Sequence, residues 1–493
     1  MAELLRVTDI KKAFAGVQAL KGVSLSITPG EIHCLAGENG CGKSTLIKII
    51  SGVYAPDEGK IEFGGHAHSK ITPIDAIRGG IQVIYQDFSI FPNLSVMENL
   101  AFNTELAAGR KVVNWTRLKK IAEEAIGRIN FQVDLSAPLG SLSVADKQMV
   151  AISRALLSNA RLIIMDEPTT ALTRKEVSAL FKVILDLKKQ DIATLFVSHK
   201  LDEVFEISER FTILRSGELV ATGSTKELDK KKFTFYMTGR AFDDAQFEPK
   251  NVSEKPVLEV KNLTLPGSFE DVSFELRRGE IVGVTGLLDS GRTELALSLF
   301  GLKKAEKGEI LKDGQKVDIE SPTDAIRAKI GYVPEDRLSE GLFLPRSIAD
   351  NIIVGEIDRL AGAAGVIDRS KRKAEIAKWV KELSIATPNP DNACQTLSGG
   401  NQQRVVLAKW LACDLDVLIL NGPTVGVDIG SKHDIHKILK SLAEKGMAIL
   451  IISDDLPEVI ENCSTILIMK RGRIVEKLEA RGATEAQISA VMM

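Results

Sequence analysis

The sequence has 493 residues, with 64 Lys and Arg against 66 Asp and Glu, which gives a formal net charge of −2. This near-neutral balance offers no bulk electrostatic reason to bind nucleic acid, so we expect no nucleic-acid partner. A chain of this length exceeds the size at which one hydrophobic core keeps growing, and at least two domains are expected.

Membrane and disulfide patterns are both missing from the sequence. No apolar run approaches the ~20 residues that span a bilayer, and the first ten residues, MAELLRVTDI, do not match a secretory signal. The five cysteines form no C-x-x-C pair, which fits a reducing, intracellular compartment. One of them, Cys41, lies in a glycine-rich loop; we interpret it as a tolerated small residue, with an oxidation-sensitive thiol as the alternative.

The first phosphate-binding signal begins at residue 37. Residues 4–27 are typical of short strands with a turn near Ala15-Gly16, and an apolar run over 31–36 leads into a G-x-x-x-x-G-K-S loop and a helical run over 45–50. In such a loop backbone N–H groups surround phosphate oxygens, the Lys reaches the β- and γ-phosphates, and the hydroxyl ligates Mg²⁺. An ordinary glycine turn is the alternative, which the order of strand, loop and helix disfavours. The predicted nucleotide-binding residues here are Gly37, Glu38, Asn39, Gly40, Cys41, Gly42, Lys43, Ser44 and Thr45.

Three later strand ends supply further residues for the same site. An apolar strand ends in Asp166 and Glu167; the first would hold Mg²⁺, and the second would act as general base or orient the attacking water. An acidic helix cap is the alternative, which the upstream loop disfavours. Gln86 and His199 each follow an apolar strand and complete a γ-phosphate environment. The predicted metal ligands are Ser44, Gln86 and Asp166, and the predicted catalytic residues are Lys43, Gln86, Glu167 and His199.

The chain repeats these features with regular spacing. Equivalent positions are 249 residues apart at the loops, as in Gly37 and Gly286, and 255 residues apart later, as in Asp166 and Asn421. Such regularity indicates a duplicated domain. The second loop is altered and ends in Arg292-Thr293 in place of Lys43-Ser44.

Each half is predicted to be α/β. Apolar runs such as those over 162–165 and 417–420 are typical of buried parallel strands, and polar helical inserts are expected over 114–129 and 368–383. Each half is then a mostly parallel α/β core with an antiparallel strand layer and a helical insert. The expected organisation is a domain over 1–240, a short aperiodic linker over 241–255 and a second domain over 256–493.

A second anion-binding element precedes a helix in the second half, where the sequence reads Leu397-Ser398-Gly399-Gly400-Asn401. Two glycines at a helix start offer bare backbone N–H groups and close approach. A glycine turn capped by Ser398 is the alternative. The first half has the weaker counterpart LSVAD, with Val144 and Ala145 at the glycine positions.

As a set, the two loops, Gln86, LSGGN, the Asp166-Glu167 pair and His199 resemble the nucleotide-binding subunits of ABC transporters. The tandem arrangement, the VPEDR segment over 333–337 and the pairing of LSVAD with LSGGN look most like the single-chain, two-domain ATPases of bacterial monosaccharide importers of the ribose, galactose, xylose and arabinose type. The resemblance covers essentially the whole chain. It implies two P-loop NTPase domains of the ABC type in tandem, ATP hydrolysis, and ATP and Mg²⁺ as cofactors.

The resemblance also implies head-to-tail pairing of the halves, so that each loop closes against the signature of the opposite half. Site one would join the first loop to Ser398, Gly399 and Gly400, with Phe14 against the adenine ring and Asp428 approaching as an acid. Site two would be impaired. Arg is bulkier than Lys, and the residues that replace the carboxylate pair and the histidine, Asn421, Gly422 and Asp454, supply no metal ligand, no base and a charge that repels the γ-phosphate.

Partners follow from the same resemblance. It implies two transmembrane permease subunits and an extracytoplasmic solute-binding protein, with this chain peripheral at the cytoplasmic face of the inner membrane. Docking is expected near 86–99 and 335–351, where the apolar clusters over 90–92 and 342–345 either receive a permease helix or pack locally. Import of a nucleoside or signalling sugar is an alternative. A soluble tandem ATPase acting in translation is more remote, because that class usually has two intact sites and a long charged linker.

Overall fold

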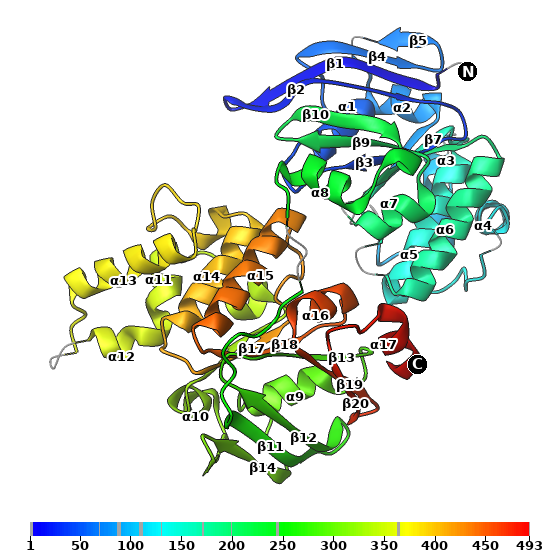
Figure 1. Ribbon diagram of the computed structural model, residues 1–493. Coiled ribbons are helices and arrows are strands. Elements are labelled where there is room, and N and C mark those ends of the chain that lie inside the picture. Colours follow the sequence, from blue (N-terminus) through cyan, green and yellow to red (C-terminus); the bar gives the residue numbers. More distant parts are fainter. Residues whose placement is uncertain are drawn as a thin grey trace. The chain divides into compact units, whose positions relative to one another are not determined.

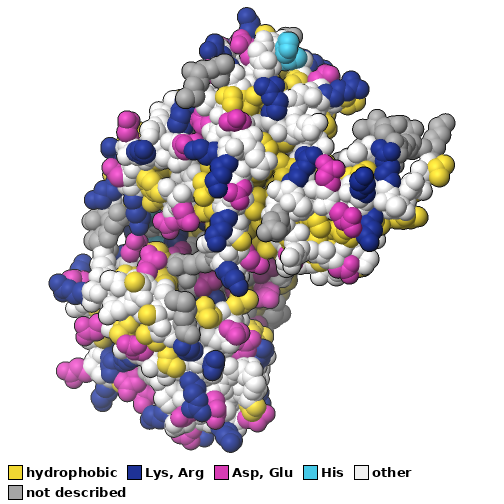
Figure 2. Space-filling model, turned by 90° about the vertical axis from the view of Figure 1, so that its right-hand side faces the viewer, with side chains coloured by type: hydrophobic (Ala, Val, Ile, Leu, Met, Phe, Trp, Pro, Cys, Tyr) yellow, Lys and Arg dark blue, Asp and Glu magenta, His cyan; other side chains and the backbone are white. Residues whose placement is uncertain are grey.

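Two compact units make up the chain, Met1–Phe242 (unit 1) and Asp243–Met493 (unit 2). They are drawn in Figure 1, a computed structural model. On the face drawn in Figure 2, basic and acidic side chains are interspersed, in keeping with the near-neutral net charge. The structure describes residues 3–68, 70–85, 90–107, 112–129, 131–169, 172–198, 200–242, 246–361 and 365–492.

Unit 1 begins with an antiparallel sheet in the order β2-β1-β4-β5. The hairpin between β1 and β2 turns at Ala15 and Gly16, whose φ angles of 45° and 85° suit a two-residue type I′ turn. Buried residues such as Leu5, Val7 and Ile10 line the core face of β1. The strands are β1 Leu5–Phe14, β2 Val17–Ile27, β4 Glu58–Phe63 and β5 His66–His68.

The second sheet of unit 1 has six strands in the order β10-β9-β3-β8-β7-β6. All neighbours are parallel except β10, which pairs antiparallel with β9. Every residue of β3 and β8 is buried, as expected for central strands that are covered on both faces. The strands are β3 Ile32–Ala36, β6 Ile81–Ile84, β7 Leu162–Asp166, β8 Ala193–Val197, β9 Arg210–Arg215 and β10 Glu218–Ser224.

A helical insert extends between β6 and β7. Leu100, Ala122, Leu139 and Val150 form the centre of its own small apolar cluster, and each fully buried Leu there contributes roughly 1.5–3 kcal/mol. The α-helices of unit 1 are α1 Lys43–Ile50, α2 Pro73–Gly79, α3 Val96–Ala107, α4 Trp115–Gly127, α5 Val144–Leu157, α6 Arg174–Lys189, α7 Leu201–Ile207 and α8 Lys230–Thr238; the 3₁₀ turns are η1 Leu139–Ser141 and η2 Thr225–Glu227.

Unit 2 repeats this topology strand for strand. Its antiparallel sheet has the order β12-β11-β14-β15, and its main sheet has the order β16-β17-β18-β13-β19-β20, with β20 again the antiparallel edge. The predicted fold class, a parallel α/β core with an antiparallel layer and a helical insert in each half, is therefore confirmed. The strands are β11 Pro256–Leu265, β12 Phe269–Arg277, β13 Ile281–Gly286, β14 Lys307–Lys312, β15 Gln315–Val317, β16 Ile330–Val333, β17 Val417–Asn421, β18 Ala448–Ile452, β19 Thr465–Lys470 and β20 Arg473–Glu479.

The helices of unit 2 also follow the order of unit 1, and a π-helical turn follows β16. They are α9 Arg292–Leu299, α10 Pro322–Arg327, η3 Arg337–Gly341, α11 Ile348–Ile353, η4 Val354–Glu356, α12 Ile357–Leu360, α13 Arg369–Glu382, η5 Cys394–Thr396, α14 Gly399–Leu411, α15 Ile429–Glu444, α16 Leu456–Asn462 and α17 Glu485–Met492. In the described part of the chain, no helix combines the length and hydropathy needed to cross a membrane.

The described part of the stretch between the halves packs on unit 2. Phe247 is buried, its N–H donates to the carbonyl of Glu461 over 3.0 Å, and the Gln246 amide donates to the carbonyl of Ile460 over 2.9 Å. Gln246 and Phe247 therefore lie against α16.

Candidate nucleotide site

The P-loop of unit 1 leaves the buried strand β3 and enters α1 through left-handed glycines. Gly42 has φ 108°, and a Cβ there would stand 2.6 Å from the carbonyl oxygen of Ala19. No side chain caps α1, so its first backbone N–H groups face the loop. Such a helix start is a ready anion site, because unpaired N–H groups and the helix dipole both favour negative charge.

Lys43 is held across this loop. Its side chain is 5% exposed, and the ammonium donates to the carbonyls of Gly37 over 2.6 Å and Glu38 over 3.0 Å. A buried ammonium needs such partners to offset its desolvation. The positive charge therefore lies against the backbone of the loop.

The surroundings of Cys41 support its interpretation as a tolerated small residue. Its side chain packs in the core of unit 1, and its carbonyl accepts from Gly217 N–H over 3.0 Å. Burial raises the pKa of the Cys41 thiol, against a smaller lowering by Lys43. A thiol that stays protonated is a poor target for oxidation, so the redox alternative loses support.

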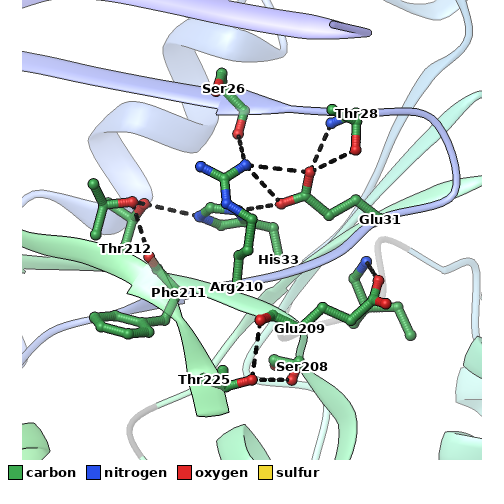
Figure 3. Close-up of polar contacts among 12 residues, drawn as sticks. Ser26, Thr28, Glu31, His33, Ser208, Glu209, Arg210, Phe211, Thr212 and Thr225 are labelled. Carbon is green, nitrogen blue, oxygen red and sulfur yellow. Dashed lines mark hydrogen bonds and ion pairs between the residues drawn. The ribbon is translucent and has the colours of Figure 1, made fainter. Parts of the chain in front are cut away.

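A buried polar network fixes the strand that carries the loop (Figure 3). The ring of His33 contacts Glu31 through Nδ1 and Thr212 through Nε2, both over 2.8 Å, and Arg210 donates to Glu31 over 3.2 Å. Burial lowers the pKa of His33. Burial also acts to raise the pKa of Glu31, but hydrogen bonds from His33 and Thr28 outweigh it and lower that pKa to about 2. A neutral ring thus links β3 to β9.

Asp166 is the last residue of β7 and is electrostatically coupled to the loop. Burial raises the pKa of its carboxyl and Glu167 raises it further, whereas Lys43 and Lys48 lower it. A half-buried carboxylate that interacts with the loop lysine gains from a hard cation. Together with the exposed hydroxyl of Ser44, it forms an oxygen donor set that fits Mg²⁺ shared with phosphate oxygens.

Glu167 follows in a strained backbone conformation. Its φ is 48°, in the left-handed region, and its N–H donates to the carbonyl of Val197 over 3.1 Å. Such a conformation costs a non-glycine residue about 1–3 kcal/mol and gathers at functional sites. Retention of a glutamate here favours a chemical role for its carboxylate. The other two predicted γ-phosphate residues, Gln86 and His199, lie outside the described residues.

Phe14 stands at the end of β1, beside the hairpin turn. Its ring is 40% exposed and meets Tyr54 edge to face, with centroids 5.2 Å apart. An exposed ring at a sheet edge is available for stacking on a planar base. The adenine contact stays a prediction.

The two signature helices start differently. In unit 1, the Ser143 hydroxyl accepts from the N–H of Asp146 over 3.1 Å and so caps α5. In unit 2, Ser398 makes no such cap; its hydroxyl accepts from the side chain of Asn401 over 3.0 Å, which leaves the first N–H groups of α14 open. The alternative in which Ser398 caps its helix is therefore wrong, and the open helix start is the one that carries the glycines.

Neighbouring side chains lie close to both glycines. A Cβ at Gly399 would stand 2.8 Å from Nη2 of Arg337, and one at Gly400 would stand 2.0 Å from Oγ of Ser431. Ser431 is in turn held by Asp428, which caps α15 through bonds of 2.8 and 3.0 Å. The carboxylate that we expected to approach the site thus serves as a helix cap within unit 2.

The second P-loop keeps the fold of the first but not its chemistry. Arg292 is 6% exposed, and its Nη2 pairs with Asp454 over 3.4 Å, while Nε and Nη1 are buried without a hydrogen-bond partner. Sequence reasoning predicted a repulsive Asp454 and missed this pairing. Asn421 is buried at the end of β17, and Gly422 follows with φ 57°.

The predicted residues are thus placed within their own units. In unit 1, Lys43 follows β3 through the loop, and Asp166 and Glu167 stand at the carboxyl end of β7, so all three belong to the same end of the parallel sheet. Unit 2 supplies the open start of α14. No group of three or more His, Cys, Asp or Glu side chains in the described ranges is arranged to hold a metal alone, so the phosphates of a nucleotide would complete any Mg²⁺ shell.

Comparison with known proteins identifies the family. The family model described as ABC transporter matches residues 20–170 and 269–425. The chain is 40% identical to the ribose import ATP-binding protein RbsA of Bacillus subtilis over 98% of both chains. It is 39% identical to a putative ribose/galactose/methyl galactoside import ATP-binding protein of Halalkalibacterium halodurans, over 98% of this chain and 93% of that one. A crystal structure of an ATP-binding cassette of an ABC transporter in its ADP conformation covers 46% of this chain and 93% of its own, at 28% identity and a TM-score of 0.43. With two matched domains and full-length relatives, this chain belongs to the ABC transporter family and is an ATPase subunit with two nucleotide-binding domains in tandem.

Proposed function

We propose that this chain hydrolyses ATP to energise the import of a monosaccharide. Relatives that are about 40% identical over nearly the whole chain and are named for ribose import support the cargo class. The glutamate that follows β7 supports the hydrolytic role, because it keeps a carboxylate next to Asp166 in a left-handed backbone conformation that costs free energy. Glu167 is the observation that carries the proposal.

In this proposal one composite site performs the chemistry. Unit 1 supplies the loop N–H groups and Lys43 for the phosphates, Ser44 and Asp166 as oxygen ligands, and Glu167 to accept a proton from the attacking water. Unit 2 supplies the bare N–H groups at the start of α14, beside Ser398, which would stabilise charge on the γ-phosphate. Bound Mg²⁺ would neutralise charge on the β- and γ-phosphates. Gln86 and His199 are proposed to complete the γ-phosphate environment.

The second site is proposed to be hydrolytically silent. It would pair Arg292 and Asn421 of unit 2 with the capped, valine-bearing signature of unit 1. Loss of a single electrostatic or proton-transfer group commonly lowers a rate by about 10²- to 10⁴-fold, and several such groups are replaced here. Thr293 and the loop glycines still permit nucleotide binding.

Two membrane permease subunits and an extracytoplasmic solute-binding protein are the proposed partners, with this chain peripheral at the cytoplasmic face. Of the expected apolar docking clusters, Phe91 and Phe343 are 47% and 59% exposed, whereas Leu342 is buried and serves local packing. Unit 2 also has a cavity of about 620 Å³ between α11, α13 and the 389–391 loop. Apolar residues such as Ala349 and Ile376 line it together with basic residues such as Arg369 and Lys373 and the acidic Asp391, a mixture that would suit an amphipathic permease segment.

The test is ATP hydrolysis by the chain assembled with its permease in lipid vesicles. Glu167→Gln should abolish turnover, while Asn421→Asp, at the position in unit 2 that corresponds to Asp166, should alter it by less than about threefold. Normal hydrolysis after Glu167→Gln would refute the assignment. Uptake of labelled ribose, galactose and a nucleoside by the same vesicles separates sugar import from the second candidate, nucleoside import; co-purification with ribosomes would instead favour a role in translation.

A further inference from the structure

Arg337 joins three segments of unit 2 that are far apart in the sequence. It is the first residue of the π-helical turn η3, after β16. Its Nη1 donates to the carbonyl of Val425 over 2.7 Å, and its Nη2 donates to the carbonyl of Gly426 over 3.0 Å. Two charge-assisted bonds from one planar guanidinium fix both the position and the orientation of the accepting backbone.

The same guanidinium lies against the signature. Its Nη2 would be 2.8 Å from a Cβ at Gly399, and the carbonyl of Gly426 would be 3.2 Å from that Cβ. Gly399 therefore touches both the arginine and the backbone that the arginine holds. We name this group, Arg337 with the 425–426 backbone and Gly399, the signature brace.

The brace places a positive charge beside the start of a helix. A cation near the N-terminus of a helix opposes the helix dipole, and Gly399 begins α14. Burial lowers the pKa of the Arg337 guanidinium, the neighbouring Asp336 acts to raise it, and the buried Nε has no hydrogen-bond partner. The guanidinium and the uncapped start of α14 both carry positive charge, and they lie side by side. This arrangement favours the binding of an anion.

The sequence of the first half supplies a natural comparison. At the offset of 249 residues that relates Gln86 to Glu335, the first half has Phe88 where the second has Arg337. Phe88 lies outside the described residues, but its signature counterpart is described and carries Val144 in place of Gly399. The cation and the glycine thus occur together in one half and are replaced together in the other. The two positions are in contact, because a Cβ at position 399 would displace the guanidinium.

We propose that Arg337 is a positioning residue for ATP hydrolysis, which holds the intact signature and the 425–428 segment in the geometry that meets the γ-phosphate. The inference rests on the proposed composite site. Arg337 acts through Gly399 and Gly426, whose backbone would face the nucleotide. Because η3 immediately precedes the exposed Phe343, the brace also connects the expected docking region of unit 2 to that signature.

The test compares Arg337→Ala and Arg337→Lys in the full chain assembled with its permease. The alanine variant should lower kcat for ATP at least tenfold with KM changed less than threefold, because the P-loop of unit 1 still binds the nucleotide. The lysine variant should recover only part of the rate, since one ammonium cannot reproduce both carbonyl bonds. Hydrogen exchange should rise at residues 399–403 and 425–428 and stay unchanged in β13, β17 and β18.

A matched control is Arg128→Ala, which removes an arginine bonded to the carbonyl of Leu156 over 2.7 Å, far along the insert of unit 1. It should leave kcat within twofold. An unchanged kcat in Arg337→Ala overturns the inference, as does a loss accompanied by faster exchange throughout unit 2, which would mean a merely structural role. Glu167→Gln is measured in parallel: if that variant hydrolyses ATP normally, the proposed function fails and the inference fails with it, whereas an inactive Glu167→Gln beside a normal Arg337→Ala refutes the inference alone.

Discussion

Glu167 and Gly422 occupy the same backbone position in their two units. Each follows a parallel strand, has φ near +50° (48° and 57°), and donates its N–H to the neighbouring strand, over 3.1 Å to Val197 and 2.8 Å to Ile452. Glycine adopts this conformation without a steric cost, whereas glutamate does not. Unit 1 therefore has backbone strain at Glu167, whereas unit 2 has none at Gly422.

This relationship predicts a trade between stability and activity. Glu167→Gly should raise the free energy of unfolding of unit 1 by about 1 kcal/mol, because it removes the left-handed strain, and should abolish ATP hydrolysis. Urea unfolding and a phosphate-release assay on the same preparation measure both effects. The reciprocal change, Gly422→Glu, should destabilise unit 2, since a Cβ there would stand 2.8 Å from Val425 and 3.2 Å from Glu335. Destabilisation by Glu167→Gly would show that the carboxylate serves the fold.

The two signature serines form a second matched pair. Ser143→Ala removes a helix cap and should lower the unfolding free energy of unit 1 by about 1 kcal/mol with little effect on turnover. Ser398→Ala removes no cap and should leave unit 2 as stable as before while slowing hydrolysis. Thermal unfolding together with ATP turnover separates the two roles. Equal stability losses in both variants would contradict the difference between the helix starts.

The buried His33 network gives unit 1 a defined pH dependence. The folded pKa values of His33 and Glu31 both lie below their unfolded values of about 6.5 and 4.5, so at acid pH the unfolded chain binds more protons. Stability should therefore fall as pH drops through 6.5, by up to about 1.4 kcal/mol per pH unit, and fall further below 4.5 as Glu31 is protonated. His33→Gln should flatten the slope between pH 6.5 and 5 in urea unfolding curves. An identical slope in the variant would show that other groups set it.

The cysteines should be unreactive in the folded protein. Burial raises the pKa of Cys34, Cys41 and Cys463, as well as that of Cys394 and Cys413. At pH 7.5 an aromatic disulfide reagent should modify the native chain slowly and label five thiols after unfolding in urea. Rapid labelling of Cys41, with loss of ATPase activity, would revive the redox interpretation of the P-loop.

Sequence reasoning predicted the features that depend on local backbone requirements. Glycine placement and apolar runs predicted the P-loop, the strands β7 and β17 and the duplicated topology. It missed contacts made through tertiary structure. The pairing of Arg292 with Asp454 and the bonds from Arg337 to Val425 and Gly426 join segments that no periodicity links.

The sequence also did not predict that the Ser398 side chain leaves its helix uncapped. Ser143 and Ser398 stand in the same local motif, but only Ser143 has an acceptor geometry that meets the backbone of its helix. The difference lies in the residue three positions later. Asp146 leaves its N–H to the serine, whereas Asn401 offers a side-chain amide that takes the hydroxyl instead.

The central claim is that one pocket, built from the P-loop of unit 1 and the glycines of unit 2, performs all the hydrolysis. Its most direct test is the ATP turnover of the assembled transporter carrying either Gly399→Val or Val144→Gly, which exchange the two signatures one position at a time. The account predicts a loss of at least about 100-fold for Gly399→Val and a change of less than about threefold for Val144→Gly. A normal rate with Gly399→Val would contradict it.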